Sequence, residues 1–399
     1  MSQEPSFLDL GVSPEVAETL ERRGMSAAFP IQTLVMRDAL AGHDVLAKSQ
    51  TGSGKTLAFA IPIVERIDPK AATPSALVLV PTRELAVQVA GEFAYLARAK
   101  GLRVGLAYGG TSVHEQGRSL RGAHVLIATP GRLDDFANRG TVALGEVRIL
   151  ILDEADRMLD MGFQPQVDRI VRRLPKERQT MFFSATLEGA AGRIADAYTR
   201  TPRRHEVVTD AQTVEELEHR FMPVSAQGKV EALVEILQHG EERTLVFVRT
   251  KRGADRLVQK LKAKGVRAEA MHGDMSQPAR QGALARFEAG KAAVLVATDV
   301  AARGLDLDGI SHVVNFDPPE DAKGYVHRVG RTARAGRSGT GVTLVTAEQQ
   351  GDVSRMAARL DLHEEFQEEG MTIAPPRVVF SGSKGGRRSS LRKPARRRF

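Results

Sequence analysis

The chain contains no cysteine and no tryptophan. The absence of cysteine excludes disulfides, thiolate metal sites, iron–sulfur clusters and a cysteine nucleophile. No apolar run approaches the roughly 20 residues that a membrane-spanning helix needs. The N-terminal sequence MSQEPSFLDL also lacks the basic and then apolar profile of a signal peptide. We therefore expect a soluble, cytoplasmic protein without a membrane partner.

Most of the chain carries no excess of positive charge. The formal net charge of the 399 residues is +8, and residues 381–399 alone hold eight basic side chains and no acidic one, so residues 1–380 are formally neutral. A polyanion site in the body must therefore be a local patch. The Gly, Ser and Pro content of the C-terminal end predicts a disordered basic tail over 372–399.

Short apolar runs of strand length alternate with segments of helical spacing, and this βαβα order predicts α/β domains with parallel sheets. A polar stretch around Pro202 separates two copies of the plan, so we expect one domain over 1–208 and a second over 209–371. The expected strands are 44–47, 76–80, 103–108, 124–128, 149–152 and 180–183, and then 244–248, 268–272, 293–297, 312–316 and 341–345.

Polar, glycine-rich or charged clusters follow nearly every expected strand. Open parallel sheets bind ligands just beyond the carboxyl ends of their strands, so these clusters should lie along one rim of each sheet. Two such rims facing each other would form a cleft.

The segment AKSQTGSGKT (47–56) follows an expected strand and precedes an expected helix. This is the context of a phosphate loop, in which backbone N–H groups and a helix N-terminus face an anion. Lys55 would reach the β- and γ-phosphates, and Thr56 would hold Mg²⁺. The alternative is a glycine-rich turn with an incidental lysine, because Ser49 stands where the strict pattern has Gly. The candidate nucleotide-binding residues of the loop are Ser49, Gln50, Thr51, Gly52, Ser53, Gly54, Lys55 and Thr56.

An acidic cluster, Asp153-Glu154-Ala155-Asp156, follows the buried run at 149–152. Asp153 would hold Mg²⁺ beside the phosphate loop, and Glu154 would orient or deprotonate the attacking water. An acidic helix cap is the alternative for such a cluster on its own. Nothing in the sequence resembles a metal cage, so Mg²⁺ should arrive with the nucleotide.

With these motifs in view, the chain resembles the DEAD-box ATP-dependent RNA helicases, closest in plan to the compact bacterial members, over roughly residues 7–347. The resemblance implies two tandem RecA-like domains separated by a cleft, with ATP as the nucleotide and RNA as the partner. It is carried by FPIQ (29–32), AKSQTGSGKT (47–56), PTREL (81–85), GG (109–110), TPGR (129–132), DEAD (153–156), SAT (184–186), LVFVRT (245–250), SQPAR (276–280), ATDVAARGLD (297–306) and HRVGRTAR (327–334).

By the same resemblance, Gln32 would read the adenine edge through its amide, and Asp306 would contact the ribose. Met25 stands where the family has an aromatic residue, and its thioether could cover the base. Phe7 could supply the missing aromatic contact, or it could pack an N-terminal segment.

The second half of the chain would supply the arginine fingers of the family, Arg331 and Arg334. Arginine suits the task because its rigid, permanently charged fork meets phosphoryl oxygens bidentately. His327 would link this motif to the acidic cluster. Ser184 and Thr186 would couple the nucleotide site to the RNA site, or would cap the following helix.

The RNA contacts implied by the resemblance come from both domains. Small residues, hydroxyls and a few arginines suit contact with the RNA backbone, and an aromatic content of 5% leaves little surface for reading bases. Taken one at a time, a Gly pair or a Thr-Pro is more often a turn. The candidates are Thr82, Arg83, Gly109, Gly110, Thr129, Gly131 and Arg132, and then Arg249, Thr250, Gly273, Arg280 and Thr298.

We therefore expect an RNA-stimulated ATPase that separates short RNA duplexes locally and without processive tracking. One alternative is an ATP-gated RNA clamp or RNA chaperone, and another is a DNA-directed motor with the same paired cores. The basic run at 381–399 would add sequence-independent RNA affinity, or would be a solubilising extension.

Overall fold

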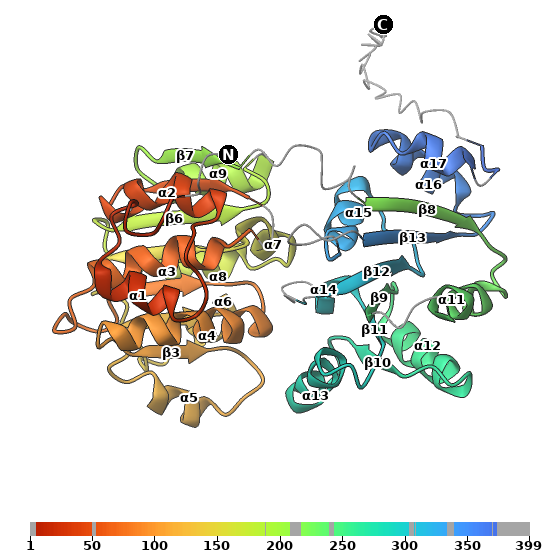
Figure 1. Ribbon diagram of the computed structural model, residues 1–399. Helices are drawn as coiled ribbons and strands as arrows, with labels where there is room; N and C mark the ends of the chain where they lie inside the picture. Colours follow the sequence, from red (N-terminus) through yellow and green to blue (C-terminus); the bar gives the residue numbers. More distant parts are fainter. Residues whose placement is uncertain are drawn as a thin grey trace, which may run out of the picture.

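The computed structural model describes residues 5–49, 53–187, 189–207, 217–238, 243–302, 307, 309–332, 339–368 and 370–372. These residues form two parallel sheets, one in each half of the chain, and helices pack against both faces of each sheet (Figure 1). The expected α/β fold with two parallel-sheet domains is confirmed. Of the expected tail over 372–399, residues 373–399 lie outside the described residues.

The first sheet has seven strands in the order β3-β4-β2-β5-β6-β1-β7, and the second has six in the order β10-β11-β9-β12-β13-β8. Every pairing within them is parallel. The strands are β1 (Val45–Lys48), β2 (Ala76–Leu79), β3 (Val104–Ala107), β4 (Val125–Ala128), β5 (Ile149–Leu152), β6 (Gln179–Ser184), β7 (Arg203–Glu206), β8 (Leu217–Pro223), β9 (Arg243–Phe247), β10 (Ala268–Met271), β11 (Val294–Ala297), β12 (Ile310–Asn315) and β13 (Gly339–Val345).

The helices connect successive strands. Those of the first half are α1 (Pro14–Glu21), α2 (Pro30–Leu40), α3 (Lys55–Arg66), α4 (Arg83–Ala99), α5 (Val113–Ser119), α6 (Pro130–Asn138), α7 (Ala155–Asp160), α8 (Gln164–Val171) and α9 (Gly189–Tyr198). Those of the second half are α11 (Lys229–Gln238), α12 (Lys251–Ala263), α13 (Gln277–Glu288), α14 (Asp299–Ala302), α15 (Ala322–Val329), α16 (Gln350–Arg359) and α17 (His363–Glu368).

The central strands are continuous apolar runs because both of their faces are buried. In β5, Ile149 and Ile151 pack in the core on one face of the sheet, and Leu150 and Leu152 pack in the core on the other. In the second sheet, Val246 and Leu245 of β9 face opposite cores in the same way. The alternation follows from the two-residue period of a strand.

Two strands at the edges of the sheets, β7 and β8, were not expected from the sequence. The four residues of β7, RRHE, are exposed or partly exposed and carry no apolar signal. β8 alternates buried and exposed positions, and His219 is one of its buried residues. β7 lies within the polar stretch that the sequence assigns to the break between domains, and β8 directly follows that stretch.

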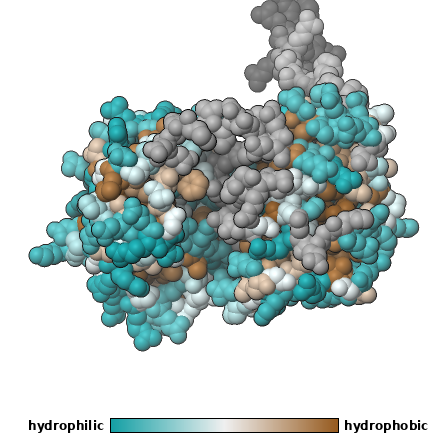
Figure 2. Space-filling view, viewed as in Figure 1, coloured by the Kyte–Doolittle hydropathy of each residue, from teal (hydrophilic) through white to brown (hydrophobic). Residues whose placement is uncertain are grey.

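The carboxyl ends of the strands meet across a cleft between the two halves. Cavities in this region are lined by residues of both halves, for example Lys55 and His327. An ion pair, from Arg280 Nη2 to Glu84 Oε1 at 3.1 Å, also joins the halves. The outward surface on the face shown in Figure 2 is largely hydrophilic over both halves. In the described part of the chain, no helix is long and apolar enough to cross a membrane.

Candidate active site

The phosphate-loop motif lies between β1 and α3, as expected. Gly54 caps α3 in the left-handed region, with φ +81°, and a Cβ there would lie 2.7 Å from the amide nitrogen of Gln32. Both facts restrict the position to glycine. Lys55 begins the helix, is 6% exposed, and donates from Nζ to the carbonyl of Ser49 at 3.2 Å. Residues 50–52, which include the predicted Gln50, Thr51 and Gly52, lie outside the described residues.

Asp153 and Glu154 follow β5 and are buried. Glu154 adopts a left-handed backbone, with φ +51°, which is costly for a side chain of this kind and is typical of functional sites. Burial raises the pKa of Asp153 to about 6, although the charge of Lys55 opposes the shift. Burial also opposes ionisation of Glu154, but the charges of Arg157, Lys55 and Arg331 outweigh it and hold the pKa of Glu154 below its usual value. Glu154 is therefore ionised at neutral pH.

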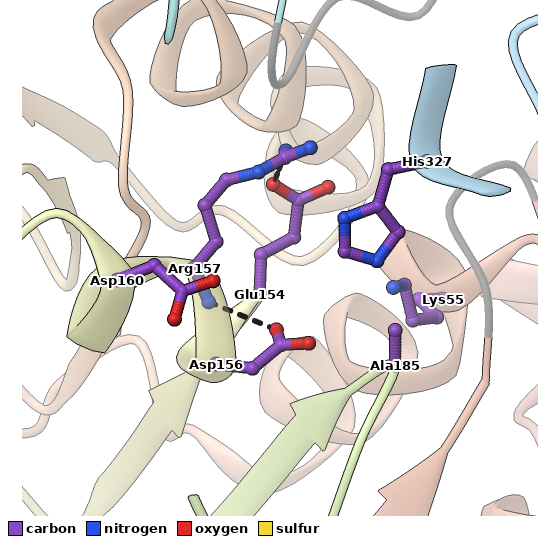
Figure 3. Close-up of a pocket in the computed structure, with 7 residues that line it drawn as sticks. All are labelled: Lys55, Glu154, Asp156, Arg157, Asp160, Ala185 and His327. Carbon is purple, nitrogen blue, oxygen red and sulfur yellow. Dashed lines mark hydrogen bonds and ion pairs between the residues drawn. The ribbon is translucent and has the colours of Figure 1, made fainter. Parts of the chain in front are cut away.

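Arg157 is a functional residue that the sequence analysis missed. It is 7% exposed, and its Nη1 donates to Glu154 Oε2 one turn back along α7. Figure 3 shows the guanidinium group against the Glu154 carboxylate. The signal in the sequence was its position three residues after Glu154, because residues three apart are neighbours on a helix.

The opposite wall of the site comes from α15 and the residues that follow it. His327 extends from this helix toward Lys55 and Glu154 (Figure 3). Arg331 is 5% exposed, lines a cavity together with Arg157, and acts electrostatically on Glu154. The structure thus brings four predicted residues from the two halves together. Two further predicted residues, Asp306 and Arg334, lie outside the described residues.

The predicted coupling motif is bonded to the acidic cluster. Ser184 is fully buried at the end of β6, and its Oγ accepts hydrogen bonds from the backbone N–H groups of Asp156 and Thr186, each at 3.3 Å. The Thr186 hydroxyl donates to Asp156 Oδ2 at 3.4 Å. A strand end and a helix start are therefore held together beside the catalytic carboxylates.

The residues of the candidate site suit a Mg²⁺ ion that binds together with a nucleotide. Thr56 and Asp153 offer hard oxygen ligands, and the described residues contain no cluster of three or more metal-ligating side chains. Proteins usually bind Mg²⁺ through one or two of their own oxygen atoms, together with phosphate and water oxygens. The Oγ of Ser49 is buried and has no hydrogen-bond partner among the described residues, as a donor to a phosphoryl oxygen would be.

Two of the three predicted adenine contacts are buried. Gln32 is fully buried, and its amide already accepts from Phe29 N and donates to Gly54 O, both at 2.9 Å. Phe7 is 3% exposed and packs in the core, as the packing alternative expects. Met25 packs against the same core. Phe29, which the sequence analysis did not single out, is 53% exposed beside Gly54 and presents an aromatic surface next to the phosphate loop.

Comparisons with known proteins agree with this geometry. The family profile described as DEAD/DEAH box helicase matches residues 29–193, and the helicase conserved C-terminal domain matches residues 228–336. The CshA DEAD-box ATP-dependent RNA helicase of Geobacillus kaustophilus is 43% identical over 350 residues, which are 87% of this chain and 75% of that protein. The chain belongs to the DEAD-box ATP-dependent RNA helicases.

Solved structures of two relatives share the fold over most of the chain. S. cerevisiae Dbp5 bound to RNA and ADP BeF3 aligns with a TM-score of 0.80 at 29% identity, over 90% of this chain and 94% of that chain. A double-deletion form of Mss116p bound to ssRNA and AMP-PNP aligns with a TM-score of 0.80 at 26% identity, over 90% of this chain and 78% of that chain. The two domains of this DEAD-box protein are therefore RecA-like.

The predicted RNA residues of the first domain lie on loops, or on the first turns of helices, that follow the carboxyl ends of its strands. Thr82 caps α4 by accepting from Leu85 N at 3.2 Å. The guanidinium of Arg83 lies so close to Gly110, where φ is +84°, that a Cβ there would clash with it, and it also borders Gly109. Arg132 is held by Gln116 Oε1 at 2.7 Å and by the Thr111 carbonyl at 3.1 Å. Thr129 and Gly131 lie at the start of α6.

The predicted RNA residues of the second domain occupy corresponding loops. Thr250 caps α12 by accepting from Gly253 N at 3.0 Å, and Arg249 beside it is exposed. Gly273 follows β10, and Thr298 follows β11. RNA contact by these residues stays a prediction.

Arg280 has a second role that the sequence did not indicate, because it forms the ion pair with Glu84 of the first domain. The two side chains are only 13% and 9% exposed. Burial lowers the pKa of Arg280, and the carboxylate of Glu84 opposes that shift. The pair therefore joins the two halves of the chain in the arrangement that the structure has.

We expect that Glu84→Gln and Arg280→Gln each weaken ATP-dependent RNA binding by about tenfold, because each leaves a charge unpaired when the domains close. The double variant should lose much less than the product of the two effects. A double-mutant cycle on the RNA Kd measures this coupling. The exposed pair of Arg286 and Glu269, which lies within the second domain, is the matched control and should give no coupling. Independent, fully additive effects of Glu84→Gln and Arg280→Gln would contradict the interpretation.

Proposed function

We propose that this ATP-dependent RNA helicase separates short RNA duplexes locally, by closing its two domains around ATP and one RNA strand. The observation that carries the proposal is the composition of the cleft. Lys55 and Glu154 from the first domain lie opposite His327 and Arg331 from the second. We take residues 1–208 and 209–371 as the two domains and 372–399 as a basic tail.

The chain supplies a distinct group for each part of phosphoryl transfer. Lys55 would bind the β- and γ-phosphates, and the carboxylate of Glu154 would accept a proton from the attacking water. Arg331 would stabilise charge that develops on the transferring group, and Arg334 would do so beside it. When bound, Mg²⁺ held by Thr56 and Asp153 would neutralise phosphate charge. The predicted contacts of Gln32 with the base and of Asp306 with the ribose would orient ATP.

The Arg157–Glu154 ion pair fits a site that is completed by nucleotide. Two cavities of about 20 Å³ each border these residues. Once a γ-phosphate is present, it competes with Glu154 for the guanidinium groups, and the carboxylate becomes available to water.

ATP and RNA would strengthen each other's binding because both favour the closed arrangement. Such a coupling is reciprocal and typically amounts to about 1–3 kcal/mol. The hydrogen bonds of Ser184 and Thr186 to Asp156 join the end of β6 to the start of α7, and this joint would carry part of the coupling between the two sites. Bending of the bound strand on closure would part a short duplex, and hydrolysis would reopen the cleft.

The direct test measures ATP hydrolysis and strand separation in parallel. We expect hydrolysis to rise on adding RNA and to rise much less with DNA of the same sequence. Separation of a duplex of about 10 base pairs, one helical turn, should far exceed separation of a duplex about three times longer. Equal stimulation by DNA would favour the DNA-directed motor, and equal separation of both lengths would contradict a local mechanism.

Met25 has no aromatic ring that could stack on the adenine base, but Phe29 has one. We expect Phe29→Ala to raise the KM for ATP about three- to tenfold with little change in kcat, because stacking on a base contributes about 1–3 kcal/mol at full contact and Phe29 is half exposed. Leu34→Ala is the matched control, since Leu34 is an exposed apolar residue of the same helix. A KM unchanged in both variants would exclude a contact between Phe29 and the base.

The basic tail should add RNA affinity through phosphate neutralisation. Deleting residues 381–399 should lower the magnitude of the slope of log K against log salt by about 0.7 for each RNA phosphate that the tail neutralises. The control keeps the length of the tail and replaces its eight basic residues with Gln. It should behave like the deletion. An unchanged slope in both proteins would identify the tail as a solubilising extension.

A further inference from the structure

A cavity of about 200 Å³ lies in the first domain at the edge of the sheet opposite the cleft. Asp44 and Thr180, two of its lining residues, stand at the amino-terminal ends of β1 and β6. Ser184, at the other end of β6, bonds the catalytic cluster. The two ends of this strand are about 13 Å apart, so the cavity is separate from the nucleotide site. β6 and β7 can be followed in Figure 1.

The lining of the cavity is predominantly cationic. Lys176, Arg178 and Arg200 contribute three positive charges, and Asp44 contributes one negative charge. The Asp44 carboxylate is already engaged, because it accepts from Thr180 N and from Arg200 N, each at 2.6 Å. Its role is to hold the backbone of the cavity walls. The cavity therefore presents a net positive charge to any molecule that binds in it.

Two buried donors of the lining residues have no partner in the described part of the chain. The guanidinium of Arg178 is fixed by bonds from Nη1 to the Pro175 carbonyl at 2.8 Å and from Nη2 to the Tyr198 carbonyl at 3.5 Å, but its Nε is unpartnered. The Thr180 hydroxyl is also unpartnered, on a side chain that is 1% exposed. Burial lowers the pKa of Arg178, and Asp44 opposes that shift. Both unpartnered atoms expose less than 1 Å² to solvent, so an anion in the cavity would meet the rest of the Arg178 guanidinium and not these two donors.

We propose that this cavity binds a phosphate-class oxyanion, either inorganic phosphate or the phosphate of a small monoester. Arginine has no acceptor, so the occupant must bring acceptor oxygens, and three cations favour one that carries two negative charges. The volume holds several waters but lies below the range of pockets for larger ligands. Bound there, the anion joins the starts of β1 and β6 to the turn at Thr199 and Arg200 that leads into β7.

The test is isothermal titration of the full chain with inorganic phosphate at constant ionic strength. A non-hydrolysable ATP analogue and Mg²⁺ are present throughout to fill the phosphate loop. We expect one site per chain, with sulfate binding comparably and chloride giving no saturable heat. A parallel titration with ribose 5-phosphate separates the two sources, because tighter binding of the monoester identifies an organic phosphate as the ligand.

Three variants assign the site. Arg178→Gln and Arg200→Gln should each weaken phosphate binding at least tenfold, and Arg200 is exposed, so its replacement leaves folding intact. Lys176→Gln should weaken binding without lowering the melting temperature, since Lys176 is an exposed residue of the cavity lining. Arg98→Gln, an exposed arginine of α4, is the control for net charge and should bind as the parent does. No saturable phosphate binding in the parent chain, or equal binding in all variants, would overturn the proposal.

Discussion

Replacing Arg331 with alanine should lower the kcat of RNA-stimulated ATP hydrolysis by about 10³-fold or more, the effect typical of removing an arginine finger. The KM for ATP should change little, because Lys55 and the phosphate loop lie on the other domain. In the proposed mechanism Arg331 meets the γ-phosphate only when the domains are closed, so its contribution would be to the transition state. The measurement is steady-state hydrolysis at saturating RNA, with ATP binding measured separately.

Two further variants make this result specific. Arg331→Lys keeps the charge but loses the planar fork, and should recover only part of the rate. Arg359→Ala, on the exposed surface of α16, should hydrolyse ATP at the parent rate. If Arg331→Ala kept a kcat within threefold of the parent, the domain two wall would not act on the phosphoryl group, and the proposed mechanism would be wrong.

The central strands were predictable because burial on both faces leaves a plain apolar run. β5 spans the predicted residues 149–152 without a shift, and β2 differs from its predicted run by one residue. The edge strands β7 and β8 were not predictable in the same way. β7 pairs with β1 through its backbone while its side chains stay largely exposed, so no hydrophobic pattern marks it.

In the candidate site, too, some residues could be predicted from the sequence and others could not. Lys55 and Glu154 could be assigned because each is part of a local motif whose chemistry is recognisable after a strand. The role of Arg157 could not, because a single arginine after an acidic cluster is usually solvated. Only the fold shows that this one is buried against Glu154. The contact of Arg280 with Glu84 depends on domain closure, for which a single sequence carries no pattern.

Replacing Glu154 with glutamine should lower ATP hydrolysis by about 10²–10⁴-fold, the contribution typical of a general base. The substitution keeps the shape of the side chain and an oxygen that can accept from Arg157, so the wall of the site should remain in place. ATP and RNA should still bind. Because hydrolysis reopens the cleft in the proposed mechanism, RNA should dissociate more slowly when ATP is present. The measurements are single-turnover hydrolysis and the RNA dissociation rate with and without ATP.

The same variant separates a cycling helicase from an ATP-gated clamp or chaperone. If strand separation depends on repeated closing and opening, Glu154→Gln should hold RNA but release few strands under multiple turnover. A clamp or chaperone should anneal and retain RNA as well as the parent does. Glu21→Gln, on the exposed surface of α1, is the control for the loss of one carboxylate. Parent-like strand separation by Glu154→Gln would show that hydrolysis is not needed for product release, and the clamp would then be the better description of this protein.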